Sequence, residues 1–243
     1  MLDRRQILAG LGTMIITTGI SKQLWAAATI KPDDASALLV IDVQNCFLPG
    51  GSLAVKEGDQ VVPVINRIAK GFTNVVMTQD WHTPGHVSFA SSHPGKKPFE
   101  TIDLAYGKQM LWPDHCVQGT PGAELHPGID WSALEAVIRK GGDPGVDSYS
   151  GFRENHGPAG LRPRTGLAGW LRERDVDEVF VCGLARDVCV LWTAQDALEL
   201  GFRASLLWDL SRPVTPDTDA ATRATLLAQG ITITETSELR QPD

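Results

Sequence analysis

The sequence predicts an α/β protein with a three-layer α/β/α architecture around a mainly parallel, six-stranded, doubly wound sheet. Short apolar runs alternate along the chain with segments of helical periodicity, which is typical of parallel strands joined by crossover helices. The 243 residues are enough for one domain with a sizeable core. We find no internal repeat and no second domain. We therefore expect a leader over residues 1–28 and one folded domain over residues 29–243.

The elements follow from the periodicity of each segment. Six apolar runs are predicted as strands, at residues 37–43, 74–79, 136–140, 178–183, 204–210 and 231–234. Four segments are predicted as helices, at residues 61–72, 166–174, 187–200 and 216–229. In the first of these, Val61, Val64, Ile65 and Ile68 recur at helical spacing. Residues 81–130 show little periodicity, and a loop of that length inside a compact domain is usually functional.

The leader resembles a twin-arginine export signal. Arg4-Arg5 precedes the moderately apolar stretch 7–20, and small residues follow at 26–28. That stretch is too short and too rich in Gly and Thr for a comfortable membrane span. We expect a periplasmic or otherwise exported protein that uses the export machinery. The alternative is a cytoplasmic protein with a frayed N-terminus.

Charge and cysteine content limit the partners. The net charge of −7 argues against a nucleic-acid partner and against stable association with an anionic membrane. We therefore expect a small-molecule substrate, and the sequence leaves a homo-oligomer open. The spacing of the four cysteines makes neither a CxxC pair nor a dense disulfide framework. We predict buried or reactive thiols rather than disulfides for Cys46, Cys116, Cys182 and Cys189.

Three reactive side chains lie at or just past the ends of predicted strands. Asp42 closes the first strand, Lys140 closes the third, and Cys189 lies in the first turn of the predicted helix 187–200. Residues at the carboxyl ends of parallel strands converge on one cleft. A helix N-terminus stabilises a thiolate, and a nearby carboxylate can take the thiol proton. Taken singly, Asp42 could cap a loop, Lys140 could be a solvated strand end and Cys189 could be an inert buried thiol. Together they predict a cysteine hydrolase.

A second group consists of metal-ligating residue types. Asp80 and His82 stand at i and i+2, His86 lies four residues further on, and His115 lies in the same irregular region. One carboxylate with two or three imidazoles suits one divalent metal ion, Zn²⁺, Fe²⁺ or Mn²⁺. The alternative is that these histidines cap loops or lie on the surface. We predict structural roles for His93 and His126 and no partner for His156.

Seven motifs occur in a consistent order over most of the chain, at residues 39–45, 49–53, 78–82, 112–120, 138–141, 147–152 and 183–190. Together they resemble the nicotinamidase/pyrazinamidase branch of the isochorismatase-like cysteine hydrolases. The Asp-Trp-His and Trp-Pro-x-His-Cys motifs are the most specific of them. The resemblance implies a metal-dependent amidohydrolase that converts nicotinamide, and pyrazinamide, to the acid and ammonia through a thioester.

The resemblance also implies a role for each site residue. Cys189 would be the nucleophile, Asp42 the proton shuttle and Lys140 the third member of the triad. The implied metal ligands are Asp80, His82 and His115, with His86 less secure because family members differ in the fourth ligand. A cis peptide would precede Ala185, and the backbone N–H groups of Ala185 and Cys189 would form the oxyanion hole. The aromatic residues expected around the substrate ring are Phe47, Trp112 and Tyr149.

Three positions depart from the family pattern. Cys46 stands where the family usually has Asp, Arg186 replaces a common Thr, and Val188 replaces a common Tyr or His. Arg186 and Val188 could alter the pocket entrance and so the substrate range. Three other hypotheses stay open at this point: a metal-free amidase for a carbamoyl or ureido substrate, a metal-activated-water hydrolase with a structural Cys189, and an exported, non-catalytic pyridine-binding protein.

Overall fold

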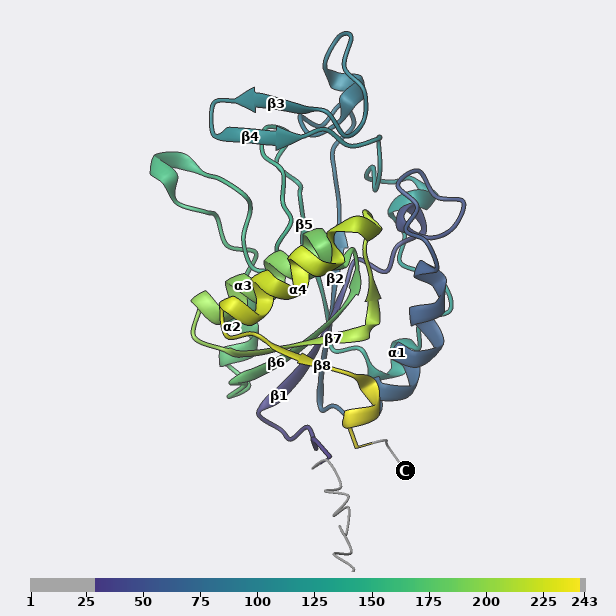
Figure 1. Ribbon diagram of the computed structural model, residues 1–243, viewed down its shortest axis with the longest axis vertical. Coiled ribbons are helices and arrows are strands. Elements are labelled where there is room, and N and C mark those ends of the chain that lie inside the picture. The colour runs from purple at the N-terminus through teal and green to yellow at the C-terminus, as the bar shows by residue number, and fades with distance from the viewer. Residues whose placement is uncertain (1–28, 241–243) are drawn as a thin grey trace, which may run out of the picture.

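A six-stranded parallel sheet forms the centre of the computed structural model, which describes residues 29–240 (Figure 1). The strands are β1 (Ser36–Ile41), β2 (Asn74–Asp80), β5 (Ala136–Lys140), β6 (Glu178–Leu184), β7 (Arg203–Arg212) and β8 (Thr232–Thr234). Their order is β5-β2-β1-β6-β7-β8, and every neighbouring pair is parallel. The chain moves outward from β1 to β5 and then returns to β6, so the order reverses beside β1. Ligands bind at such a reversal in α/β sheets.

Helices cover both faces of the sheet, which confirms the predicted three-layer fold (Figure 1). They are α1 (Val61–Ala69) on one face and α2 (Leu167–Arg172), α3 (Leu191–Glu199) and α4 (Asp219–Ala228) on the other. All six residues of β1 are buried, and its five apolar residues, 37–41, alternate between the two cores. This alternation follows from the two-residue period of a strand.

The helices are shorter than the sequence predicts at several ends. Residues 216–218 form a 3-10 turn before α4, and residues 186–190 form a π-helical turn before α3. Among residues 29–240, no helix combines the length and apolar character needed to cross a membrane. The predicted export signal lies outside the described residues.

The long irregular region contains a β-hairpin that the sequence analysis missed. Its strands are β3 (Thr101–Leu104) and β4 (Gly107–Met110), paired antiparallel. Figure 1 shows the hairpin beyond the end of the sheet toward which the parallel strands run. Each strand has only four residues and is mostly exposed, so neither produces a marked apolar run. The hairpin and its flanking loops build over the same edge of the sheet as the predicted site.

Two of the four cysteines form a disulfide, so the prediction of thiols at these positions is wrong. Cys46 and Cys116 are bonded across a sequence separation of 70 residues, with their Cα atoms 5.7 Å apart. The loop after β4 folds back over the loop after β1. The spacing of the cysteines along the sequence does not predict this contact. Cys182 and Cys189 are free and buried, as predicted.

Candidate active site

The structure brings Asp42, Lys140 and Cys189 together at the carboxyl edge of the sheet. The Lys140 Nζ atom lies 3.0 Å from Asp42 Oδ2 and 3.6 Å from Cys189 Sγ. It also donates a hydrogen bond of 2.8 Å to the backbone carbonyl of Ser148. Lys140 and Asp42 are fully buried, and Cys189 is only 6% exposed. The three chemical groups therefore interact away from bulk water.

Asp42 is held in place by a residue that the sequence analysis did not single out. Thr78 on β2 donates a hydrogen bond of 2.6 Å to Asp42 Oδ1 and accepts one of 3.1 Å from the Asp42 backbone N–H. Asp42 itself has a left-handed φ of 47°, which ends β1 and turns the carboxylate toward the site. A hydroxyl directly after the apolar run 75–77 is the only signal that could have pointed to Thr78.

Cys189 lies in the π-helical turn Arg186–Val190, not in the first turn of an α-helix as predicted. The backbone N–H groups of Val188 and Val190 both donate to the Ala185 carbonyl, at 3.1 Å each. The peptide bond between Leu184 and Ala185 is cis, as the family resemblance implies. This tight turn brings Ala185 and Cys189 to the same cavity.

Burial and ion pairing set the charges of these groups. Burial alone would lower the pKa of Lys140, but Asp42 and Asp80 raise that pKa well above its ordinary value, so the side chain stays an ammonium. Burial raises the pKa of the Cys189 thiol, and the positive charge of Lys140 opposes this shift. Burial also raises the pKa of Asp42. Cys189 and Asp42 are therefore two groups that can exchange a proton beside a fixed cation.

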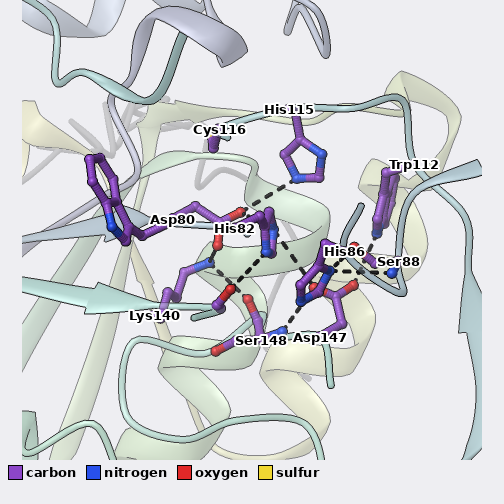
Figure 2. Close-up of polar contacts among 12 residues, drawn as sticks. Asp80, His82, His86, Ser88, Trp112, His115, Cys116, Lys140, Asp147 and Ser148 are labelled. Carbon is purple, nitrogen blue, oxygen red and sulfur yellow. Dashed lines mark hydrogen bonds and ion pairs between the residues drawn. The ribbon is translucent and has the colours of Figure 1, made fainter. Parts of the chain in front are cut away.

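Asp80, His82 and His115 form a cluster beside Lys140 of this triad (Figure 2). Asp80 Oδ2 lies 3.0 Å from His82 Nε2 and 3.4 Å from His115 Nε2. Its other oxygen, Oδ1, lies 3.0 Å from Lys140 Nζ. Although burial favours protonation of Asp80, attraction to His82 and Lys140 holds the pKa of this carboxyl well below its usual range. Asp80 thus links the cluster to the triad as an anion.

The donor atoms of the cluster fit a divalent cation. His82 Nδ1 lies 3.0 Å from the Gly141 carbonyl, and His115 Nδ1 lies 2.8 Å from the Pro113 carbonyl. Because a carbonyl only accepts hydrogen bonds, each Nδ1 carries a proton, and each Nε2 can offer a lone pair to an ion once it is deprotonated. The buried His82 Nε2 atom has no hydrogen-bond partner. Two lone pairs and a carboxylate oxygen that converge without a donor are a ligand set for a metal.

The backbone beside the cluster leaves no room for a side chain at Gly141. This residue has a φ of +69°, and a Cβ atom there would lie 2.6 Å from His82 Cε1 and 2.9 Å from Asp80 Oδ1. Glycine permits both the left-handed conformation and the close approach of the carbonyl to His82.

The structure gives His86 other partners than the Asp80 cluster. Its Nδ1 atom accepts a hydrogen bond of 3.2 Å from the Ser88 backbone N–H and lies 2.8 Å from Ser88 Oγ. Its Nε2 atom therefore carries the proton, and it lies 2.8 Å from the Asp143 carbonyl. As a fourth ligand His86 would have to give up these hydrogen bonds, so that role stays a prediction.

Asp147 is a site residue that the sequence analysis named only as part of a motif. It is buried, accepts hydrogen bonds of 2.8 Å from Gln109 Nε2 and 3.3 Å from Trp112 Nε1, and lies 3.9 Å from His82 Nε2. With His82 and His86 it forms a second group whose ligand atoms lie within 4.8 Å of one another. Gln109 belongs to β4, so the unpredicted hairpin helps to hold this carboxylate.

A small cavity opens onto both groups. It is lined by Phe47, Leu53, Asp80, Trp112, His115, Asp147, Tyr149, Ala185, Val188, Cys189 and Val214. All three predicted aromatic residues are in this lining. A mostly apolar cavity with a few convergent polar groups is typical of a small-molecule site.

Val188 lines the cavity, but Arg186 does not. The Arg186 guanidinium lies 4.0 Å from the Trp208 ring centroid and pairs with Asp219 at 3.1 Å. The Arg186 side chain is thus engaged by Trp208 and Asp219, and an effect of Arg186 on the pocket entrance stays a prediction.

The remaining histidines lie outside the site. His93 contacts the Val87 carbonyl and His126 accepts from the Gly128 N–H, which are structural roles as predicted. His156, for which no partner was predicted, stacks on Tyr106.

Comparison with known proteins identifies the class. The isochorismatase domain model matches residues 36–238, and the chain belongs to the isochorismatase family. Among curated proteins it is similar to the nicotinamidase of Acinetobacter baylyi, with 49% identity over 185 residues, 76% of this chain and 85% of that protein.

The chain is also similar in structure to three solved proteins. The nicotinamidase/pyrazinamidase of Acinetobacter baumannii has a TM-score of 0.80 at 46% identity, covering 85% of this chain and 98% of that one. A structure from L. infantum in complex with nicotinate has a TM-score of 0.76 at 39% identity, and the match covers 87% of this chain and 98% of that one. The pyrazinamidase of Pyrococcus horikoshii in complex with zinc has a TM-score of 0.65 at 35% identity, covering 83% and 99%.

Proposed function

We propose that this chain is a nicotinamidase/pyrazinamidase, an amidohydrolase that converts nicotinamide to nicotinate and ammonia. The observation that carries the proposal is the meeting of the Asp42, Lys140 and Cys189 side chains with the Asp80, His82 and His115 cluster at one cavity. The first group can break an amide through a covalent intermediate, and the second can hold a metal that orients the substrate. No observation favours any of the three other hypotheses.

In the first half of the reaction, Cys189 Sγ attacks the carboxamide carbon while its proton passes to Asp42. The backbone N–H groups of Ala185 and Cys189 serve as donors for the oxyanion. Asp42 then delivers the proton to the nitrogen as the carbon–nitrogen bond breaks, and ammonia leaves a thioester on Cys189. Lys140, 3.0 Å from Asp42, stabilises the negative charge on the carboxylate and on the sulfur.

In the second half, water attacks the thioester carbon and gives its proton to Asp42. The carbon–sulfur bond breaks, the acid product leaves, and Cys189 takes back the proton. The Thr78 hydrogen bond keeps Asp42 in one orientation for both transfers. A water-poor site strengthens each of these charge interactions.

The residues that would hold the ion are Asp80, His82 and His115. Zn²⁺, Fe²⁺ and Mn²⁺ all suit this ligand set. When bound, such an ion would supply a Lewis acid for the ring nitrogen of the substrate, which orients the carboxamide. Phe47, Trp112 and Tyr149 would enclose the ring, since aromatic faces favour a flat heterocycle.

We expect chelation to lower the rate of ammonia release from nicotinamide by roughly 100-fold, the scale on which a misplaced substrate slows a reaction. The measurement uses purified residues 29–243 before and after removal of metal, and after addition of Zn²⁺, Fe²⁺ or Mn²⁺. Restoration by at least one ion is expected. Full turnover in a sample shown to be free of metal would contradict the metal's role, and a metal-loaded sample that released no ammonia would contradict the function itself.

We also propose that the protein is exported. The twin-arginine pattern at Arg4-Arg5 supports this, and so does the Cys46–Cys116 disulfide, because disulfides persist in oxidising compartments. Replacing both arginines by lysine in the full chain should retain the protein in the cytoplasm, as measured by cell fractionation. Equal distribution of the wild type and this variant would rule the proposal out.

A further inference from the structure

Two neighbours of site residues carry the disulfide. Cys46 directly precedes Phe47, which lines the cavity, and Cys116 directly follows His115, which belongs to the Asp80 cluster. The Phe47 and His115 rings are themselves in contact, with centroids 5.5 Å apart. The covalent bond thus joins the two backbone segments immediately behind a pair of facing rings.

On the Cys116 side, the backbone is tied to both histidines of the cluster. The Cys116 carbonyl accepts a hydrogen bond of 3.0 Å from the His82 N–H, and the Gln118 N–H donates to the His82 carbonyl at 2.8 Å. Cys116 also has a φ of 46°, in the left-handed region that a residue with a side chain rarely adopts. Such a conformation persists only where the surroundings hold it. The disulfide is one of the constraints that hold it, and so helps to fix His115.

On the Cys46 side, backbone hydrogen bonds connect the cysteine and its neighbour to the loop that lines the cavity. The Cys46 carbonyl accepts a hydrogen bond of 3.0 Å from the Leu53 N–H, and the Phe47 carbonyl accepts one of 2.8 Å from the Val55 N–H. Leu53 and Phe47 both line the cavity. A displacement of Cys46 would therefore move two residues of the substrate pocket.

We propose that the Cys46–Cys116 disulfide is a positioning element of the site: it holds His115 toward the metal and Phe47 toward the substrate ring. The proposal rests on the proposed metal-dependent function. It explains why the sulfur pair is buried beside the site, with each cysteine only 1% exposed. It also assigns a purpose to Cys46, at which this chain departs from the family pattern.

The test is the double variant Cys46→Ala/Cys116→Ala, with Cys182→Ala as the matched control. Cys182 is a free, fully buried cysteine in β6, so its variant also loses a buried sulfur but no cross-link. We expect the double variant to bind Zn²⁺ at least about tenfold more weakly in competition with a chromophoric chelator, the loss typical when the support of a metal ligand is removed. We also expect a several-fold higher KM for nicotinamide with a smaller change in kcat.

The control should lose thermal stability but keep its Zn²⁺ affinity and KM. If the double variant binds Zn²⁺ as tightly as the wild type with the same KM, the proposal is overturned and the disulfide only stabilises the fold. Because Zn²⁺ competition needs no turnover, this result stays distinguishable from a failure of the proposed function, which an absence of ammonia release by the wild type would show.

A second measurement applies if the double variant does not fold. Dithiothreitol reduces the wild-type disulfide by two electrons: the sulfur–sulfur bond breaks, each sulfur takes a proton, and the reagent becomes a cyclic disulfide. Alkylation and peptide mapping identify the reduced Cys46 and Cys116. Faster transfer of Zn²⁺ from the reduced, still folded protein to the chelator supports the proposal, and an unchanged transfer rate overturns it.

Discussion

We expect Cys189→Ala to lower kcat for nicotinamide by about a million-fold, or about 8 kcal/mol of transition-state stabilisation. The thioester needs the Sγ atom, and no other thiol is available to replace it: Cys182 is fully buried on β6, and Cys46 and Cys116 are bonded to each other. The variant should keep its fold and its affinity for nicotinate and Zn²⁺, because the cluster and the aromatic residues are unchanged. Ammonia release and calorimetric binding of nicotinate measure the two properties separately.

Cys182→Ala is the control for this variant as well, and its kcat should stay close to that of the wild type. Mass spectrometry of acid-quenched wild-type enzyme should find a nicotinoyl group on the peptide that contains Cys189. If Cys189→Ala kept more than about 1% of the wild-type turnover, a thioester would be excluded. Loss of the nucleophile lowers turnover far more than about 100-fold.

Lys140→Met should be the second most damaging change. The substitution keeps the length of the side chain but leaves the carboxylates of Asp42 and Asp80 buried without their shared ammonium, each at 3.0 Å from Lys140 Nζ. Removing one partner of a buried ion pair destabilises a protein by about 3–5 kcal/mol. The same charge stabilises the reacting groups, so we also expect kcat to fall by about 100- to 1,000-fold. Urea unfolding and ammonia release measure the two effects.

Arg203→Met is the matched control, because Arg203 also pairs with two carboxylates, those of Asp177 and Glu178, but is 63% exposed. Exposed ion pairs contribute less than about 1 kcal/mol, so this variant should unfold almost like the wild type. Equal losses of stability for the two variants would show that the ammonium of Lys140 has no special role in the buried site.

The framework of the fold could be predicted from the sequence because each central strand is an uninterrupted apolar run. β1 and β6 are buried on both faces, which leaves a clear signal at 37–43 and 178–183. The hairpin β3–β4 could not be found in this way, since Thr101–Leu104 and Gly107–Met110 are mostly exposed and bury no continuous face. Its contribution to the site through Gln109 depends on tertiary contacts that periodicity does not record.

The site residues also fall into those that could be predicted from the sequence and those that could not. Asp42, Asp80 and Lys140 could be found because they end apolar runs, and a parallel sheet places such residues at one edge. Thr78 and Asp147 act through hydrogen bonds to other site residues, and no local pattern assigns them this role. The pairing of Cys46 with Cys116 requires two loops to meet, which no spacing of cysteines can establish. The sequence thus indicates the reacting groups better than the residues that hold them.

The backbone at residue 141 has a consequence for changing the substrate preference. A Cβ atom at Gly141 would lie within 3 Å of both His82 and Asp80, so no other residue fits at this position. A mutant library that varies residue 141 would therefore lose most of its members to a damaged metal centre. Leu53, Val188 and Val214 are apolar residues of the cavity wall. Trimming these three side chains is the direct route to accepting bulkier pyridine carboxamides.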